Sequence, residues 1–155
     1  MTLNLSKKLK SPWWLFLTTH TMLIERIERE LEEAKLPPLS WYDVLFSLSF
    51  APDHRLRMHE LADTIVLSRS NLTRLVDRLE AKGLLYRKSC PNDRRGAYAV
   101  LTPEGLEMQQ RMWPVYEGAI TKYFSSHLND KEKQALAEIL ERILTSTHKE
   151  HGRDS

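Results

Sequence analysis

Basic side chains crowd into the middle of the chain, where they could bind phosphate groups. Between residues 68 and 95, eight lysines and arginines stand against three acidic residues, a local net charge of +5, although the net charge of the whole chain is only +2. Such uneven charge is the electrostatic footprint of a surface that binds nucleic acid. The basic members are Arg69, Arg74, Arg78, Lys82, Arg87, Lys88, Arg94 and Arg95.

The residue patterns of an enzyme are missing from the sequence. Its five glycines form no phosphate-binding loop, and it has no nucleophile elbow, metal-ligand cluster or spaced pair of carboxylates. His148 and His151 have a helical spacing that could chelate a metal ion, but no carboxylate or cysteine completes the ligand set. We therefore predict no enzymatic activity, no metal site and no cofactor.

The composition is that of one globular domain. Hydrophobic residues at 41% and charged residues at 28% exclude a disordered or fibrous chain. No apolar run reaches the roughly 18 residues that a membrane span requires, and the single cysteine excludes an internal disulfide framework. The lysines near the start precede an apolar run, but Thr18, Thr19 and His20 interrupt it, which a signal peptide does not show. We expect a single domain over residues 1–155, located in the cytoplasm.

Six helices and one hairpin are expected to position the basic residues. Ser11 followed by Pro12 is a helix start, and Ser40, with Asp43 three residues later, is the expected N-cap of the second helix. Asn129 and Glu132 form a capping box for the last helix. The sequence predicts helices over residues 12–35, 40–50, 58–65, 69–82, 103–127 with a kink at Pro114, and 130–145, and hairpin strands over residues 84–89 and 97–102.

The fourth predicted helix carries the residues best suited to contact DNA. Ser68 is its expected N-cap, and Gly83 stands just past its end. An apolar stripe along one side of this helix turns the polar side outward, where its donors and acceptors suit base edges and phosphates. The polar side consists of Ser70, Thr73, Arg74 and Asp77, with Asn71 and Arg78 on its flank.

A short helix, a turn, a longer basic helix and a hairpin follow one another in the order of a winged helix-turn-helix. The sequence thus predicts a mainly α fold with a small β-wing, in which residues 53–102 form the DNA-binding core. Arg94 and Arg95 lie at the expected tip of the wing, where their weakly hydrated guanidinium groups suit a narrow minor groove, and Asp93 could hold one of them in place. The predicted DNA contacts are Ser68, Arg69, Ser70, Asn71, Thr73, Arg74, Arg78, Lys88, Arg94 and Arg95.

Other interpretations of these residues stay open. Arg74 and Arg78 could lie on a solvated helix face, although like charges four residues apart are unfavourable without an anionic partner. Cys90 lies close to Lys88 and Arg94 in the sequence and could form a stabilised thiolate that acts as a redox switch. The winged helix could also be a protein-binding adaptor, in which case binding would respond little to salt.

The stretch LADTIVLSRSNLTRLVDRLEAKGLLYRKSCPNDRRGAYAVLTPEG resembles the DNA-binding core of the MarR (multiple antibiotic resistance regulator) family of bacterial transcription factors. The family's wing signature, Asp-x-Arg followed by a strand that ends Leu-Thr, is matched by Asp93, Arg95, Leu101 and Thr102, whereas a valine common in that strand is Ala99 here. The resemblance implies a homodimer that binds an inverted-repeat operator in double-stranded DNA, usually as a repressor. It also implies release of the operator when a small aromatic effector binds.

The terminal helices are expected to complete the molecule as a dimer. Alone they would leave apolar stripes in water; a two-fold dimer would bury these stripes and set two recognition helices about 34–36 Å apart, one turn of DNA. The resemblance likewise places dimerisation helices at residues 11–36 and 103–147 and an effector pocket among them. The residues nominated for that pocket are Trp13, Leu17, His20, Trp41, Leu45 and Tyr116, and ordinary core or interface packing is the alternative for them.

Overall fold

The computed structural model describes residue 7, residues 9–66 and residues 71–151 of the 155, without the side chains of residues 93–95 and 148–151. Its fold is mainly α with one small antiparallel sheet, as the sequence predicts. The elements are α2 (Pro12–Glu33), α3 (Leu39–Phe50), a 3-10 turn η1 (Pro52–His54), β1 (Arg55–Arg57), α4 (Met58–Thr64), α5 (Leu72–Ala81), β2 (Leu85–Cys90), β3 (Asp93–Leu101), α6 (Pro103–Tyr123), a 3-10 turn η3 (Ser125–His127) and α7 (Asp130–His151).

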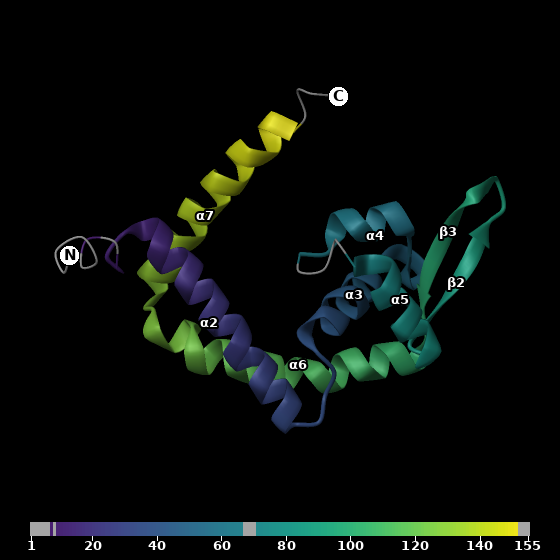
Figure 1. Cartoon of the computed structure of the whole chain (residues 1–155), viewed down its shortest axis with the longest axis horizontal. Helices are drawn as coiled ribbons and strands as arrows, with labels where there is room; N and C mark the ends of the chain where they lie inside the picture. Colours follow the sequence, from purple (N-terminus) through teal and green to yellow (C-terminus); the bar gives the residue numbers. More distant parts are fainter. Residues whose placement is uncertain (1–6, 8, 67–70, 152–155) are drawn as a thin grey trace.

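Strands β2 and β3 form the predicted wing, a hairpin that projects from one end of the molecule (Figure 1). β3 is the central strand, flanked by β2 and by β1, a three-residue strand that the sequence did not predict. Only Pro91 and Asn92 separate the two hairpin strands, so β3 begins at Asp93 and already contains Arg94 and Arg95. This corrects the prediction that both arginines lie in a loop.

One hydrophobic core holds the winged helix together. The apolar stripe of α5, which includes Leu75, Val76 and Leu79, is buried as predicted and packs with side chains of α3, α4 and the sheet. α6 begins against the same core. There the Thr102 hydroxyl accepts a hydrogen bond from the backbone N–H of Gly105 (3.0 Å) and donates one to the carbonyl of Gly83 (2.7 Å). The helix that follows the wing is thereby fixed to the winged helix.

A second core joins the long helices α2 and α6 to the start of α3. Its buried side chains include Ile27 and Leu31 of α2 and Met112 of α6, and the half-buried Met108 packs against both cores. At the polar edge of this core, Glu30 accepts hydrogen bonds from the Tyr123 hydroxyl (2.6 Å) and from Lys122 Nζ (3.3 Å). The two cores therefore meet along α6, which connects the winged helix to the terminal helices.

Several helix boundaries differ from those predicted. α3 begins at Leu39 with Pro38 as N-cap, and the predicted cap Ser40 lies inside the helix. The reason is tertiary, because the Leu39 N–H donates to Glu28 Oε1 (2.9 Å). α5 begins only at Leu72, with Asn71 in the N-cap position; Ser68 lies outside the described residues. α6 ends at Tyr123, whereas α7 continues to residue 151, past its predicted end.

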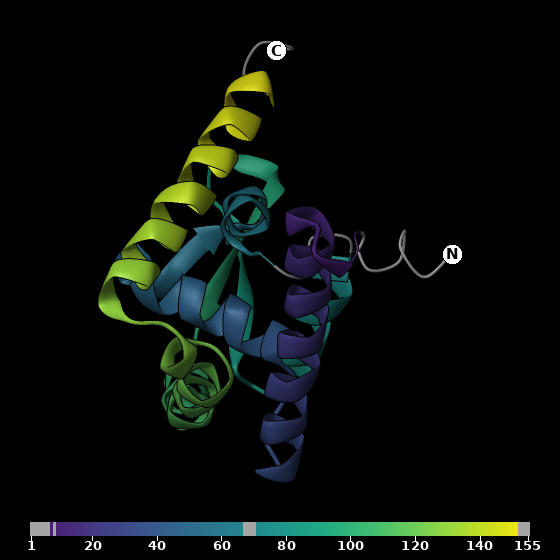
Figure 2. The same ribbon diagram turned by 90° about the vertical axis from the view of Figure 1, so that its left-hand side faces the viewer.

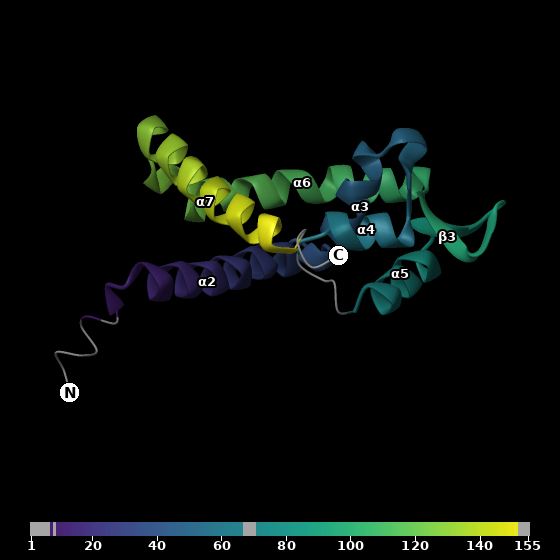
Figure 3. The ribbon, with the colours of Figure 1, turned by 90° about the horizontal axis from the view of Figure 1, so that it is seen from above.

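The helices α2, α6 and α7 extend away from the wing. Seen from above, α2 and α6 run lengthwise and the winged helix lies at one end of them (Figure 3). α7 stands apart from the other helices as a separate rod (Figure 2), and its predicted capping box is confirmed: Asn129 and Glu132 exchange two hydrogen bonds of 3.0 and 2.9 Å. None of the helices built by the described residues is long and apolar enough to cross a membrane.

Candidate nucleic-acid interface

The polar side of α5 is exposed, as the sequence predicts. Thr73, Arg74 and Arg78 point to solvent from one side of the helix, whereas Leu72 and Leu75 are buried on the other. Asn71 is also exposed and precedes the first turn. Four of the predicted DNA contacts thus share an accessible surface at and after the start of this helix. Three others, Ser68, Arg69 and Ser70, lie outside the described residues.

This surface continues onto α3 through a hollow of about 230 Å³. The sequence nominated three of the lining residues but did not connect Ser40 with them. No ion pair among the described residues engages Arg74 or Arg78. The hollow therefore combines two uncompensated guanidinium groups with hydroxyl and amide donors, which is a setting for an oxyanion. Its lining residues are Ser40, Asn71, Arg74, Leu75 and Arg78.

A single arginine connects the wing to α5. Arg87 Nη2 of β2 lies 2.7 Å from Asp77 Oδ1 and 3.4 Å from the carbonyl oxygen of Thr73, and its Nη1 lies 3.1 Å from Glu80 Oε1. The backbone N–H of Arg87 also donates to Glu80 Oε2 (2.6 Å). Charge-assisted hydrogen bonds of this kind are short and directional. They fix how the hairpin lies against the helix.

The same contacts change the expected role of Asp77. The sequence placed this residue on the DNA-facing side of its helix, and its side chain is 60% exposed, but it is paired with Arg87. Since Arg87 also engages Glu80, its positive charge offsets part of the negative charge of two carboxylates that would otherwise repel phosphate beside Arg74 and Arg78. The sequence did not predict this role of Arg87. The available signal was its position two residues after Leu85 on the buried side of a strand.

The wing carries the remaining predicted contacts. Lys88 is exposed on β2, and Arg94 and Arg95 are the second and third residues of β3. The side chains of both arginines and of Asp93 lie outside the described part. That Asp93 holds one of the two arginines in place therefore stays a prediction. Cys90 is buried at the end of β2, with 6% of its surface exposed, which gives an oxidant little access to the thiol.

One chain does not bring the six residues nominated for an effector pocket together. His20 lines an apolar groove with Ile120 and Phe124 toward the far end of α6, whereas Trp13 is mostly exposed near the start of α2. Leu45 is fully buried in the winged-helix core, and Trp41 packs against the same core. Leu17 is exposed on α2, and Tyr116 belongs to the second core. The nomination stays a prediction that one chain alone does not support.

Around Tyr116 the structure builds an aromatic cluster instead. Its ring centroid lies 5.1 Å from that of Tyr42 and 5.8 Å from that of Trp113. Tyr42 also stacks on Phe46, which in turn contacts the largely exposed Phe50. The two phenylalanines were not nominated, although Tyr42, Phe46 and Phe50 follow one another at intervals of four residues, which places them on one face of α3.

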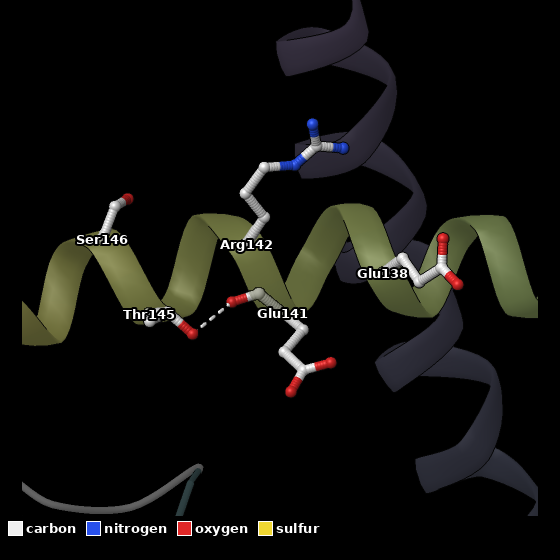
Figure 4. Close-up of a pocket in the computed structure, with 5 residues that line it drawn as sticks. All are labelled: Glu138, Glu141, Arg142, Thr145 and Ser146. Carbon is white, nitrogen blue, oxygen red and sulfur yellow. Dashed lines mark hydrogen bonds between the residues drawn. The ribbon is translucent and has the colours of Figure 1, made fainter.

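A second hollow lies on α7 (Figure 4). All of its lining residues come from this one helix, and the hydroxyl of Thr145 donates back to the carbonyl of Glu141 (2.8 Å). Because no second element contributes groups to it, we assign it no site. Among the described residues, no three His, Cys, Asp or Glu side chains gather as metal ligands would; the side chains of His148 and His151 lie outside that part. The lining residues are Glu138, Glu141, Arg142, Thr145 and Ser146.

The arrangement of winged helix and long flanking helices has solved counterparts. Sco3205, a MarR family transcriptional regulator from Streptomyces coelicolor solved in complex with DNA, is 33% identical, with a TM-score of 0.80 over 86% of this chain and 84% of that one. AbsC, a MarR family regulator from the same organism, is 29% identical, with a TM-score of 0.79 over 88% of this chain and 91% of that one. Both likenesses extend beyond the wing to the terminal helices.

Sequence comparison gives the same family. A sequence model described as MarR family matches residues 35–96. MhqR of Bacillus subtilis, an HTH-type transcriptional regulator, is 30% identical over 96 residues, which is 62% of this chain and 66% of MhqR. The first curated relatives are matched over less than two thirds of their own lengths. With the solved structures, these matches show that the chain belongs to the MarR family of transcriptional regulators.

Proposed function

We propose that this protein is a homodimeric transcription regulator that binds double-stranded DNA at an inverted-repeat operator. The observation that carries the proposal is the exposed side of α5, with Thr73, Arg74 and Arg78 next to a wing held in place by Arg87. The DNA complex of the 33% identical Sco3205 supports it. The protein would then act in the cytoplasm, where its operator is, without an enzymatic role.

The geometry favours a division of labour between helix and wing. α5 has the length and polarity to lie in the major groove, where Asn71 and Arg74 can reach base edges. The wing would lie in the adjacent minor groove, where Arg95 adds positive charge. Arg78, beside the hollow at Ser40, is better placed for a backbone phosphate. The helix would then select the sequence, and the wing and the hollow would add affinity for any duplex.

A second copy of the chain is proposed to cover the exposed apolar side chains of the terminal helices. These side chains are too numerous to be scattered surface residues, and contiguous apolar patches in water mark interfaces. A two-fold dimer would also present two α5 helices to a palindromic site. The exposed apolar residues concerned are Leu15, Phe16, Leu17 and Met22 of α2 and Ile139, Ile143 and Leu144 of α7.

We further propose that the regulator is a repressor that a small aromatic effector releases from DNA. Because Trp13 and Leu17 are exposed on the first half of α2, whereas Trp41 of α3 packs against the winged-helix core, one chain does not close a pocket from the nominated residues. A second copy could bring its own Trp13 and Leu17 next to the aromatic cluster at Tyr116. The effector site, like the operator, would then exist only in the dimer.

Selection of DNA from a random pool tests the proposed function. The protein is titrated against random duplexes by fluorescence anisotropy at two salt concentrations, and the bound fraction is sequenced. We expect an enriched inverted repeat whose binding falls steeply with salt. Arg74→Ala or Asn71→Ala should cost about 1–3 kcal/mol and blur the selected sequence, while Arg95→Ala should weaken all duplexes alike and flatten the salt slope.

The outcome also separates this function from its alternative. Binding that is absent or insensitive to salt would favour a protein-binding adaptor over a DNA-binding regulator. Equal effects of all three substitutions on sequence preference would contradict the division of labour between α5 and the wing. The described residues do not favour the adaptor, since the polar side of α5 is cationic rather than apolar.

A further inference from the structure

The sheet of the winged helix has an outer face on which only Lys88 is a predicted DNA contact. The strand register puts Arg57, Tyr98 and Lys88 side by side across β1, β3 and β2, and a second row of three lies two residues away. Since side chains alternate along a strand, all six point to the same side of the sheet. This outer sheet face consists of Arg55, Arg57, Tyr86, Lys88, Tyr98 and Val100.

The opposite side of the sheet is turned toward the helices. Ala99 is fully buried there, Leu85 and Leu101 belong to the winged-helix core, and Arg87 reaches α5 from the same side. The outer sheet face must therefore point away from α5 and toward solvent. Its exposed members agree with this, because Arg57 and Lys88 are exposed and Tyr86 is 47% exposed.

Two arginines are held in place on this face by one aromatic ring. The Cζ atoms of Arg55 and Arg57 lie 4.7 and 5.7 Å from the centroid of Tyr98, which is within cation–π distance. Hydrogen bonding to Tyr98 is also the main cause that raises the pKa of Arg57. A stacked guanidinium loses less conformational freedom when it binds an anion, because part of that freedom is already lost.

The positive charge of the outer sheet face is largely uncompensated. No ion pair among the described residues includes Arg55, Arg57 or Lys88. The carboxylate of Glu60 lies at the edge of this group, where it accepts a hydrogen bond from the backbone N–H of Arg57 (3.0 Å) and caps α4. Two exposed cations, Arg57 and Lys88, and the half-buried Arg55 thus lie around one tyrosine.

We propose that the outer sheet face is a second phosphate-binding surface, which holds the DNA duplex beyond the base pairs that α5 and the wing tip contact. Strands lie about 4.8 Å apart, so the backbones of Arg57 and Lys88 are roughly 10 Å apart across Tyr98. Two long side chains at this separation can reach successive phosphates of one DNA strand. The surface is also continuous with the wing tip, since Lys88 precedes the hairpin turn by only three residues.

The proposal rests on the proposed function and predicts a dependence on duplex length. Wild-type protein and an Arg55→Gln, Arg57→Gln double variant are titrated against the selected operator, either alone or extended by about one helical turn of DNA at each end. Extension should tighten wild-type binding and steepen its salt dependence by about 0.9 in log–log slope for each phosphate gained. The double variant should bind the short operator like the wild type and lose the gain from extension.

Control variants distinguish this from a loss of fold or of general charge. Arg111→Gln removes one positive charge from the exposed surface of α6 and should leave the gain intact. The Arg55→Lys, Arg57→Lys double variant keeps the charge and should recover most of the gain, while thermal unfolding shows that each variant is folded. An equal loss on short and extended duplexes, or no gain for the wild type on extension, would overturn the inference. Failure of the wild type to bind the short operator would instead overturn the proposed function, and with it this inference.

Discussion

Arg87 determines how the wing lies relative to α5, and its contacts make a prediction at the scale of one residue. Arg87→Met removes the partner of Asp77 and Glu80, so that the hairpin loosens and the freed carboxylates can pair with Arg74 or Arg78. We expect the variant to stay folded, with a free energy of unfolding about 1 kcal/mol lower than that of the wild type. We also expect it to bind DNA about ten-fold more weakly. Urea unfolding and anisotropy titration measure the two effects.

A charge exchange separates the electrostatic role of Arg87 from simple packing. The exchange is made in a Glu80→Gln background, because a carboxylate at position 87 would otherwise face that of Glu80. There the Arg87→Asp, Asp77→Arg double variant can form the ion pair in the opposite direction, so DNA binding should recover part of what either single variant loses. Additive losses in the double variant would show that Arg87 acts in some other way than through Asp77. The side chain of Arg87 is 27% exposed, so the exchange does not place an unpaired charge in the core.

Glu30 provides a pH-dependent test of the joint between α2 and α6. Hydrogen bonds from Tyr123 and then from Lys122 lower the pKa of this carboxyl in the folded protein. A lowered folded-state pKa stabilises the fold at pH values above the unfolded-state pKa, about 4.3, and that stabilisation disappears as the pH falls through the folded-state value. Tyr123→Phe should therefore lower the free energy of unfolding at pH 7, and the difference from the wild type should shrink toward pH 3. A difference that stays constant with pH would mean that Glu30 is not the group concerned.

The sequence predicted which residues of α5 face solvent but not what they touch. Helical periodicity separates Arg74 from Leu75 and Val76 without any knowledge of the rest of the fold. The ion pair between Arg87 and Asp77 depends on how the hairpin packs against the helix, and the local sequence pattern carries no information about that packing. The same limit applies to Ser40, which lies near Arg74 and Arg78 only because α3 begins beside α5.

At the scale of the element, the start of α6 depends on a glycine. A Cβ on Gly105 would overlap the carbonyl oxygen of Leu84 and lie 2.6 Å from Leu101 Cδ1, so Gly105→Ala would force the helix away from the wing. We expect a loss of about 1–3 kcal/mol in the free energy of unfolding, measured in urea. Gly118, in the same helix, is the matched control because a Cβ there meets nothing within 4 Å. Gly118→Ala should be neutral or stabilise by about 0.5–1 kcal/mol, and similar losses at both positions would contradict this account.

Element boundaries were predicted well where the cap is local and poorly where it is tertiary. Asn129 and Glu132 cap α7 within a span of four residues, and the sequence predicted their contact. Ser40 was predicted to cap α3. Instead the backbone N–H of Leu39 donates a hydrogen bond to the side chain of Glu28, which lies eleven residues before Leu39 in the sequence. β1 was missed for the same reason, because three residues become a strand only when β3 lies beside them.

At the scale of the whole molecule, the winged helix and the terminal helices differ in how completely one chain buries their apolar residues. Val44, Val76, Leu79 and Ala99 are fully buried in the winged-helix core, so that part can be stable within one chain. α7, in contrast, exposes most of its apolar side chains. The sequence indicated that these stripes need a partner, and their exposure in one chain agrees with that.

The exposed stripe of α7 gives the prediction for the assembled protein. Ile143 is 56% exposed in one chain and lies on the same side of the helix as Ile139. Ile143→Glu would place a carboxylate in the apolar interface of the proposed dimer, where an unpaired charge costs several kcal/mol. We expect this variant to sediment as a monomer and to lose tight binding to an inverted repeat, since each copy then holds a single half-site. Thr145→Glu makes the same change of charge on the opposite side of α7 and should remain a dimer (Figure 4). If both variants remain dimers, α7 does not form the interface, and the exposed face of α2 would have to hold the two copies together.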